Sequence, residues 1–144
     1  MTHEKRKIVV LQTSYAGALV SRDLLLGMGL QEEREFTIIR KVQDLENELD
    51  RGSRQLLITG YLFDSGIDIE EVVTKAREQN TELVTMSFAP SPLHGQFDHH
   101  IDNRAGVMTA NFIQAVSGFL IGTMNRTGQI LTPFERTERS QWYL

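Results

Sequence analysis

Short apolar runs that alternate with amphipathic stretches constrain the fold of this chain more than any other feature of its sequence. The runs lie within residues 8–11, 35–40, 55–59 and 83–88, and residues 8–11 and 56–58 consist only of valine, isoleucine and leucine. A strand in which both alternating sets of side chains are apolar is buried on both faces, as in a parallel sheet. The runs therefore predict strands in the interior of a domain that combines helices with a sheet.

Segments with helical periodicity separate these strands. Apolar residues recur three and four positions apart in residues 16–28, 42–51, 69–78 and 109–121, and residues 97–101 form a short candidate fifth strand. Gly27, Gly29 and Gly52 are expected to end the first two helices, and Thr109 to cap the last. Alternation of this kind requires right-handed crossovers, so we predict an α/β fold with a doubly wound, five-stranded parallel sheet.

The length of the chain indicates one domain. It has 144 residues, of which 40% are hydrophobic and 24% charged, as in ordinary globular proteins. The periodic pattern ends at Gly122. We therefore expect an α/β domain over residues 1–122 and a tail, or a lead into a further segment, over residues 123–144.

Charge and cysteine content exclude several functions. The formal net charge is −4, and no cluster of Lys and Arg large enough to follow a phosphate backbone is present, so we expect no nucleic-acid partner. The absence of cysteine excludes disulfides, thiolate metal sites and cysteine nucleophiles. No apolar run is long enough to cross a bilayer. We expect no membrane contact and a cytoplasmic location.

Over residues 6–122 the order and spacing of these elements resemble the receiver domains of two-component response regulators, which have a flavodoxin-like fold. Residues 55–88 carry most of the resemblance: a buried strand, a loop with glycine, a helix that ends in Arg77 and a strand that ends in Ser87. The resemblance implies a receiver-like domain that acts in signalling or regulation.

The residues that receivers use for phosphorylation do not recur here. The family binds a divalent cation with an acidic pair after the first strand and accepts the phosphoryl group on an aspartate after the third. These positions fall at Gln12 and Thr13 and at Thr59 or Gly60, and the family's lysine falls near residues 102–104. Only Ser87 matches. The resemblance therefore implies a degenerate receiver, a pseudo-receiver, that is no enzyme, needs no cofactor and acts through protein–protein contacts.

The connection between the fourth and fifth strands is too short for the family's fourth helix. Only residues 89–96 intervene, and they include Pro90 and Pro92, so this helix is expected to be missing or reduced. Its loss is expected to expose apolar residues of the fourth and fifth strands and of the last helix: Leu83, Met86, Phe88, Phe97, Ile101 and Phe112. Such a patch favours a homodimer, or a cover formed by the aromatic tail.

Aromatic and aliphatic residues in loops and in the tail extend this expected interaction surface. We assign to it Tyr61, Phe63, Leu93, Phe112, Trp142 and Tyr143. The loop residues Tyr61 and Phe63 fit equally well a contact surface and a cover for the edge of the sheet.

Histidine and aspartate residues gather between positions 94 and 102. His94, His100 and Asp102 are candidate metal ligands, since imidazole and carboxylate suit zinc or copper. In an extended strand, however, Asp98, His100 and Asp102 share one face and His99 points to the other. We therefore favour a polar edge strand with solvated histidines and predict no bound metal.

A second function remains open, in which the carboxyl edge of the sheet binds a phosphate-bearing ligand or a flavin. Its candidate residues are Thr13, Ser14, Thr59, Ser87 and Asn103. Anions bind at such edges through backbone N–H groups and helix N-termini. Neither Ser14 nor Ser87 lies in a nucleophile-elbow motif, so hydrolase chemistry is not expected.

Overall fold

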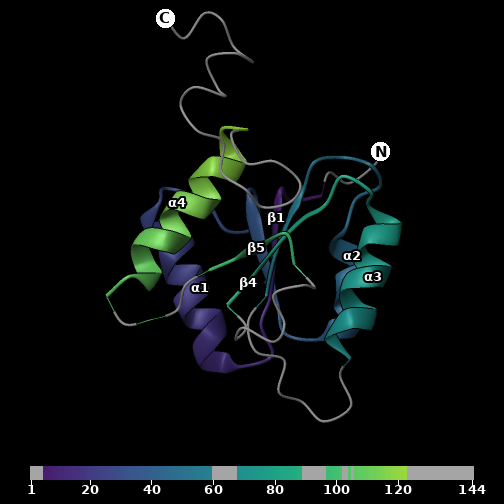
Figure 1. Ribbon diagram of the computed structural model, residues 1–144, viewed down its shortest axis with the longest axis horizontal. Helices are drawn as coiled ribbons and strands as arrows, with labels where there is room; N and C mark the ends of the chain where they lie inside the picture. The colour runs from purple at the N-terminus through teal and green to yellow at the C-terminus, as the bar shows by residue number, and fades with distance from the viewer. Residues whose placement is uncertain (1–4, 60–67, 89–96, 102–103, 105, 123–144) are drawn as a thin grey trace, which may run out of the picture.

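Five parallel strands form one sheet in the order β2-β1-β3-β4-β5 (Figure 1). They are β1 (Ile8–Leu11), β2 (Phe36–Ile39), β3 (Leu56–Thr59), β4 (Val84–Ser87) and β5 (His99–His100). The computed structural model describes residues 5–59, 68–88, 97–101, 104 and 106–122. The predicted doubly wound parallel sheet is confirmed.

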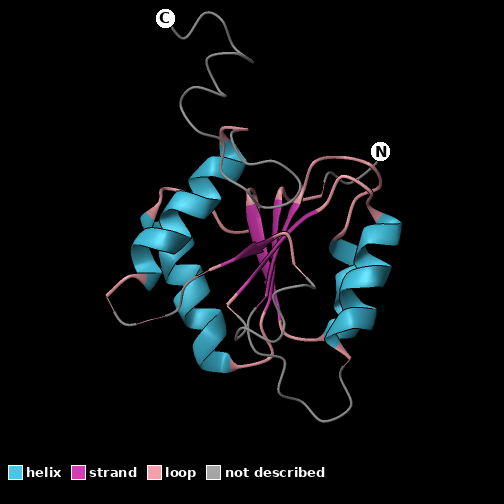
Figure 2. Ribbon diagram, in the orientation of Figure 1, coloured by secondary structure: helices cyan, strands magenta, loops and turns pink. Residues whose placement is uncertain are grey.

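Two layers of helices enclose the sheet (Figure 2). Helices α1 (Tyr15–Gly27) and α4 (Met108–Leu120) lie on one face. The 3-10 turn η1 (Val42–Asp44), the short helix α2 (Leu45–Glu48) and helix α3 (Ile69–Gln79) lie on the other. None of the helices in the described part of the chain is long and apolar enough to cross a membrane.

Each face of the sheet has its own hydrophobic core because successive strand side chains point to opposite sides. Ile8 and Val10 belong to the core beneath α1 and α4, whereas Val9 and Leu11 belong to the core beneath α2 and α3. All four are completely buried. This two-sided burial explains why β1 carries an uninterrupted apolar run.

Local chemistry sets the helix boundaries. Helix α1 begins earlier than predicted because the Ser14 hydroxyl accepts a hydrogen bond from the Gly17 N–H at 3.2 Å. Residues 42–51 form η1 and one turn of α2, since Leu49 is already extended. The prediction that Thr109 caps the last helix is wrong: α4 begins at Met108, and its N-cap Val107 makes no side-chain cap.

The apolar patch expected beside the fifth strand is not exposed. Leu83, Met86, Phe88, Phe97, Ile101 and Phe112 are all at most 9% exposed. Helix α4 supplies Phe112, whose ring stacks on Phe88 at 5.7 Å between centroids. The expectation of an uncovered sheet was therefore wrong: Met86, Phe88, Ile101 and Phe112 lie in the core beneath α1 and α4, and Leu83 lies in the core beneath α2 and α3. Residues 89–96, for which we predicted no helix, lie outside the described residues.

A buried polar network joins β4 to β5 and α3. The Asp98 carboxylate accepts hydrogen bonds from the Thr85 N–H at 2.9 Å and from its hydroxyl at 3.1 Å, and it pairs with the Arg77 guanidinium at 3.1 Å. Thr85 is fully buried. The side chain of Asp98 thus satisfies a β4 N–H just before the two-residue strand β5 begins.

Candidate functional site

The ends of β1, β3 and β4 bring polar side chains to one edge of the sheet. Leu11 pairs in register with Thr59, and Thr59 with Ser87. These aligned residues share one face, the face on which Leu11 packs with the α2–α3 core. Thr59 and Ser87 are both buried, and the Thr59 hydroxyl forms no hydrogen bond with any residue that the structure describes.

Gln12, which follows β1, points to the opposite face. Its amide nitrogen donates to the Ser21 hydroxyl in α1 at 3.3 Å, and only 4% of the residue is exposed. Its amide oxygen lies so close to Gly17 that a Cβ at position 17 would stand 2.7 Å from it. The first of the two positions at which receivers carry an acidic pair is therefore occupied by a neutral side chain packed against α1.

The loop from β1 to α1 is held by local hydrogen bonds. Ser14 caps α1, and the Thr13 carbonyl accepts a hydrogen bond from the Arg40 guanidinium at 3.0 Å. Arg40 also lies 5.6 Å from the ring centroid of Tyr15. Arg40 was not among the site residues predicted from the sequence, although a basic residue at the end of the second predicted strand was a usable signal. It brings a positive charge to the same edge as Thr13.

The candidate ligand residues are thus only partly brought together. Thr59 and Ser87 are neighbours on adjacent strands, whereas the Ser14 hydroxyl is engaged at the start of α1. Asn103 lies outside the described residues. Ligand binding at this edge of the sheet stays a prediction.

The histidines of β5 alternate as expected. His99 aligns with Met86 and His100 with Ser87, so they face opposite sides of the sheet. Asp98 is engaged with Arg77 and Thr85. Within the described ranges no three potential ligands cluster in a way that could hold a metal ion. His94 and Asp102 lie outside those ranges.

Most of the proposed contact residues also fall outside the described part of the chain: Tyr61, Phe63, Leu93, Trp142 and Tyr143. Phe112 is described and is completely buried, so it belongs to the core and not to the described surface.

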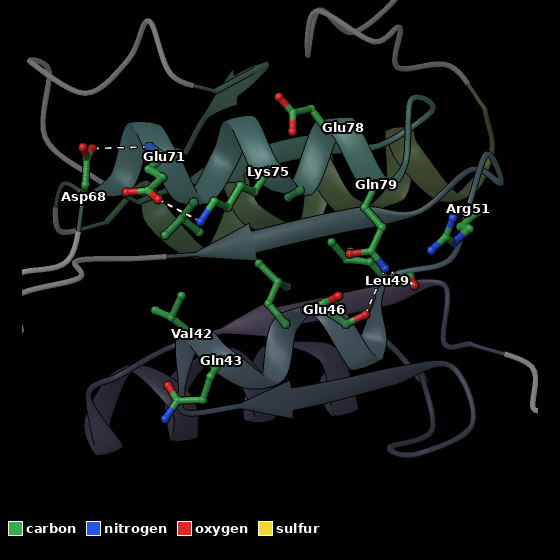
Figure 3. Close-up of a pocket in the computed structure, with 13 residues that line it drawn as sticks. Val42, Gln43, Glu46, Leu49, Arg51, Asp68, Glu71, Lys75, Glu78 and Gln79 are labelled. Atoms are coloured by element: carbon green, nitrogen blue, oxygen red, sulfur yellow. Dashed lines mark hydrogen bonds and ion pairs between the residues drawn. The ribbon is translucent and has the colours of Figure 1, made fainter.

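A groove of about 680 Å³ runs between α2 and α3 (Figure 3). Its apolar lining comes from Val42, Leu45, Leu49, Val72 and Ala76, and charged residues border it. Glu71 accepts a hydrogen bond from Lys75 at 2.8 Å, which raises the pKa of that lysine. The Gln79 amide bridges to the carbonyls of Glu46 and Leu49. The lining residues include no serine, cysteine or histidine, so they offer no hydroxyl or thiol nucleophile.

A second hollow, of about 640 Å³, lies at the amino edge of the sheet, and Lys5, Lys7, Arg34 and Arg54 contribute to its lining. The Arg54 guanidinium stands over the Phe119 ring at 4.0 Å, and burial lowers the pKa of this group. Glu35 and Asp50 also line the hollow, so its charge is mixed.

Comparisons with known proteins identify the fold. No protein-family model and no curated protein matches the sequence. Among solved structures, the chain is similar to the response regulator TrrA from Thermotoga maritima in complex with Mg²⁺ and BeF, with a TM-score of 0.61 and 15% identity over 81% of this chain and 99% of TrrA. It is also similar to an adenylate cyclase structure from Rhodopirellula baltica, with a TM-score of 0.51 and 13% identity over 83% of this chain and 100% of that one. The chain is a receiver-like α/β domain with a flavodoxin-like fold.

Proposed function

We propose that this domain is a non-catalytic pseudo-receiver that acts in signalling or regulation through protein–protein contacts and is not phosphorylated on aspartate. The observation that carries the proposal is the placement of Gln12, whose neutral amide is buried against α1 where a receiver needs a metal-binding carboxylate. Thr13, Thr59 and Gly60 supply no carboxylate either. Magnesium binding in proteins relies on carboxylates, and an acyl phosphate requires one.

In this proposal the regulatory role depends on surfaces that contact other proteins and not on a phosphorylation site. Candidate contact segments are the last helix, α4, residues 89–96 and the tail with Trp142 and Tyr143, together with residues 61–63. We expect the partner to be a protein, including a second copy of the chain, and the location to be the cytoplasm.

We predict that acetyl phosphate with Mg²⁺ will not phosphorylate this chain. A phosphate-affinity gel should show no shifted band, and a magnesium titration should leave the ¹⁵N–¹H signals of residues 12–14 and 59 unchanged. An ordinary receiver domain treated in parallel is the positive control. A metal-dependent phosphoryl group that hydroxylamine removes would contradict the proposal, because it would reveal an acceptor carboxylate.

One observation favours the second candidate function, a site for a phosphate-bearing ligand or flavin at Thr13, Ser14, Thr59, Ser87 and Asn103. The Thr59 hydroxyl is buried and bonds to none of the described residues. An unsatisfied buried hydroxyl costs free energy unless a ligand or water satisfies it.

Replacing Thr59 by valine separates the two functions. Without a ligand, we expect Thr59→Val to raise the free energy of unfolding by up to about 1 kcal/mol, because the shape is kept and the unpaired hydroxyl is removed. Urea unfolding measures this, with Thr37→Val on β2 as a control whose hydroxyl donates to Glu33. Visible absorption of the purified protein and NMR titrations with inorganic phosphate and riboflavin 5′-phosphate test for the ligand. Binding that Thr59→Val weakens would favour the second function.

A further inference from the structure

The layer formed by α1 and α4 is almost free of charge. The two helices, each of 13 residues, contain only two charged side chains, the adjacent Arg22 and Asp23 of α1. In the whole chain 24% of residues are charged. These helices lie side by side on one face of the sheet (Figure 1), so they present one continuous outer surface.

Helix α3 shows what a water-facing helix of this protein looks like. Its exposed positions include Glu70, Glu71, Lys75 and Glu78, and its buried positions are Val73 and Ala76. Surface helices typically follow this division, and a helix that is apolar on all sides is usually buried. Helix α1 departs from it, because large apolar side chains occupy its outer side.

The exposed side chains form a stripe along α1. Tyr15 is 66% exposed, Leu19 37% and Leu26 42%. With the exposed Arg22 they follow one another at intervals of four, three and four residues, which places them on one side of the helix. Val20 lies beside the stripe and is 44% exposed. On the neighbouring helix, Ile113 of α4 and its C-cap Ile121 are 40% and 63% exposed. Large apolar side chains that are exposed together on one face of a protein often mark a contact site.

We propose that this face binds a second copy of the chain, with the two α1 helices antiparallel about a two-fold axis between Arg22 and Asp23. In that register Leu19 of each copy meets Leu26 of the other. Arg22 of each copy meets Asp23 of the other, so the only two charges of the layer neutralise each other twice. A two-fold interface requires a patch that is complementary to itself, and the order Leu19, Arg22, Asp23, Leu26 meets that requirement.

The charge pattern favours a second copy over an unrelated partner, because Arg22 and Asp23 complement each other about a two-fold axis. Arg22 already pairs with Glu32 at 3.0 Å, but both side chains are substantially exposed, and such pairs contribute little. The arginine can therefore contact a facing carboxylate at small cost. A stable dimer buries about 800 Å² per partner, so the interface would include the exposed apolar side chains of α4 as well as those of α1. This dimer would make a second copy of the chain the partner in the protein–protein contacts proposed above. Its regulatory meaning rests on that proposed function.

Sedimentation equilibrium of the full chain across the micromolar range tests the interface. The unaltered chain should dimerise, and Leu19→Glu/Leu26→Glu should be monomeric while keeping its circular dichroism spectrum and cooperative melting. Thr74→Glu, on the exposed side of α3, is the matched control and should dimerise normally. A full chain that stays monomeric would overturn the proposal, pointing to a cover by residues 123–144 or by another protein.

Charge reversal tests the register. Arg22→Asp alone places two aspartates together, and Asp23→Arg alone places two arginines together, so each should weaken dimerisation about tenfold or more. Mixing the two single variants should restore the dimer, because each arginine or aspartate then meets its opposite. Glu32→Gln, which removes only the ion pair within one copy, should leave the affinity unchanged. A dimer that none of these reversals weakens would overturn the proposed register.

The phosphorylation assay on the same samples keeps the two proposals separate. If the chain is monomeric and acetyl phosphate does not modify it, only the dimer proposal is overturned. If the chain is dimeric and becomes phosphorylated on aspartate, only the pseudo-receiver proposal is overturned.

Discussion

Replacing Asp98 by alanine is expected to lower the free energy of unfolding by about 3 kcal/mol, because it leaves two buried donors of Thr85 without an acceptor and breaks an ion pair with Arg77, whose side chain is 29% exposed. The change removes the acceptor of the Thr85 N–H and hydroxyl and leaves the Arg77 guanidinium without this partner. Thr85 is completely buried, and the side chain of Asp98 is 11% exposed, so water replaces these bonds poorly. Urea unfolding followed by circular dichroism measures the loss.

Two further variants define the origin of the effect. Asp98→Asn keeps the shape and one acceptor oxygen but loses the charge, so we expect a loss of about 1–2 kcal/mol. Glu71→Ala removes an exposed carboxylate that pairs with Lys75 on the same helix α3, and should cost about 0.5 kcal/mol or less. If Asp98→Ala were as mild as Glu71→Ala, the network would not be what holds β5 against β4.

Hydrogen exchange gives a local readout of the same network. The Thr85 amide is protected by the Asp98 carboxylate, and the Ile101 amide by the Ser87 carbonyl at 2.8 Å. In Asp98→Ala both amides should exchange faster relative to those of β1, because the edge strand is then held by fewer bonds.

Replacing Phe112 by alanine is expected to cost about 3–5 kcal/mol, as truncation of a buried aromatic side chain typically does. Phe112 is completely buried, stacks on Phe88, and belongs to the core that includes Met86 and Ile101. The cavity would open between α4 and the two strands at the edge of the sheet. The urea unfolding midpoint and the melting temperature should both fall.

The neighbouring residue supplies the control. Ile113→Ala, at a position that is 40% exposed, should cost about 0.5 kcal/mol or less in the Leu19→Glu/Leu26→Glu background, where association does not contribute. Equal effects of the two substitutions would mean that Phe112 is not the core residue that its burial indicates.

Sequence reasoning located most of the elements because the pattern of a buried parallel strand is local. Residues 8–11 are apolar without interruption, and both alternating sets of β1 side chains are buried in the structure. The start of α1 and the structure of residues 42–51 were harder to predict. Ser14 decides the first through one hydrogen bond, and the extended backbone of Leu49 decides the second.

Burial at the edge of the sheet could not be predicted in the same way. The shortened connection after β4 suggested exposed apolar strands, yet Phe88, Ile101 and Phe112 are buried together. The length of a loop does not determine where the next helix packs. Here α4 covers the region, so the dimer proposed above uses the outer surface of α1 and α4 and not the face of β4 and β5.

At the candidate site, the sequence by itself determined which chemical groups are present, and tertiary structure decided where they point. The absence of carboxylates at positions 12, 13, 59 and 60 can be read directly from the chain. That Gln12 turns into the α1 interface, and that Thr59 and Ser87 lie together on the opposite face, follows from strand register and helix packing. The pairing of Asp98 with Arg77 and the nearly uncharged outer surface of α1 and α4 depend likewise on which elements pack together. Such contacts join residues distant along the chain, so no local pattern encodes them.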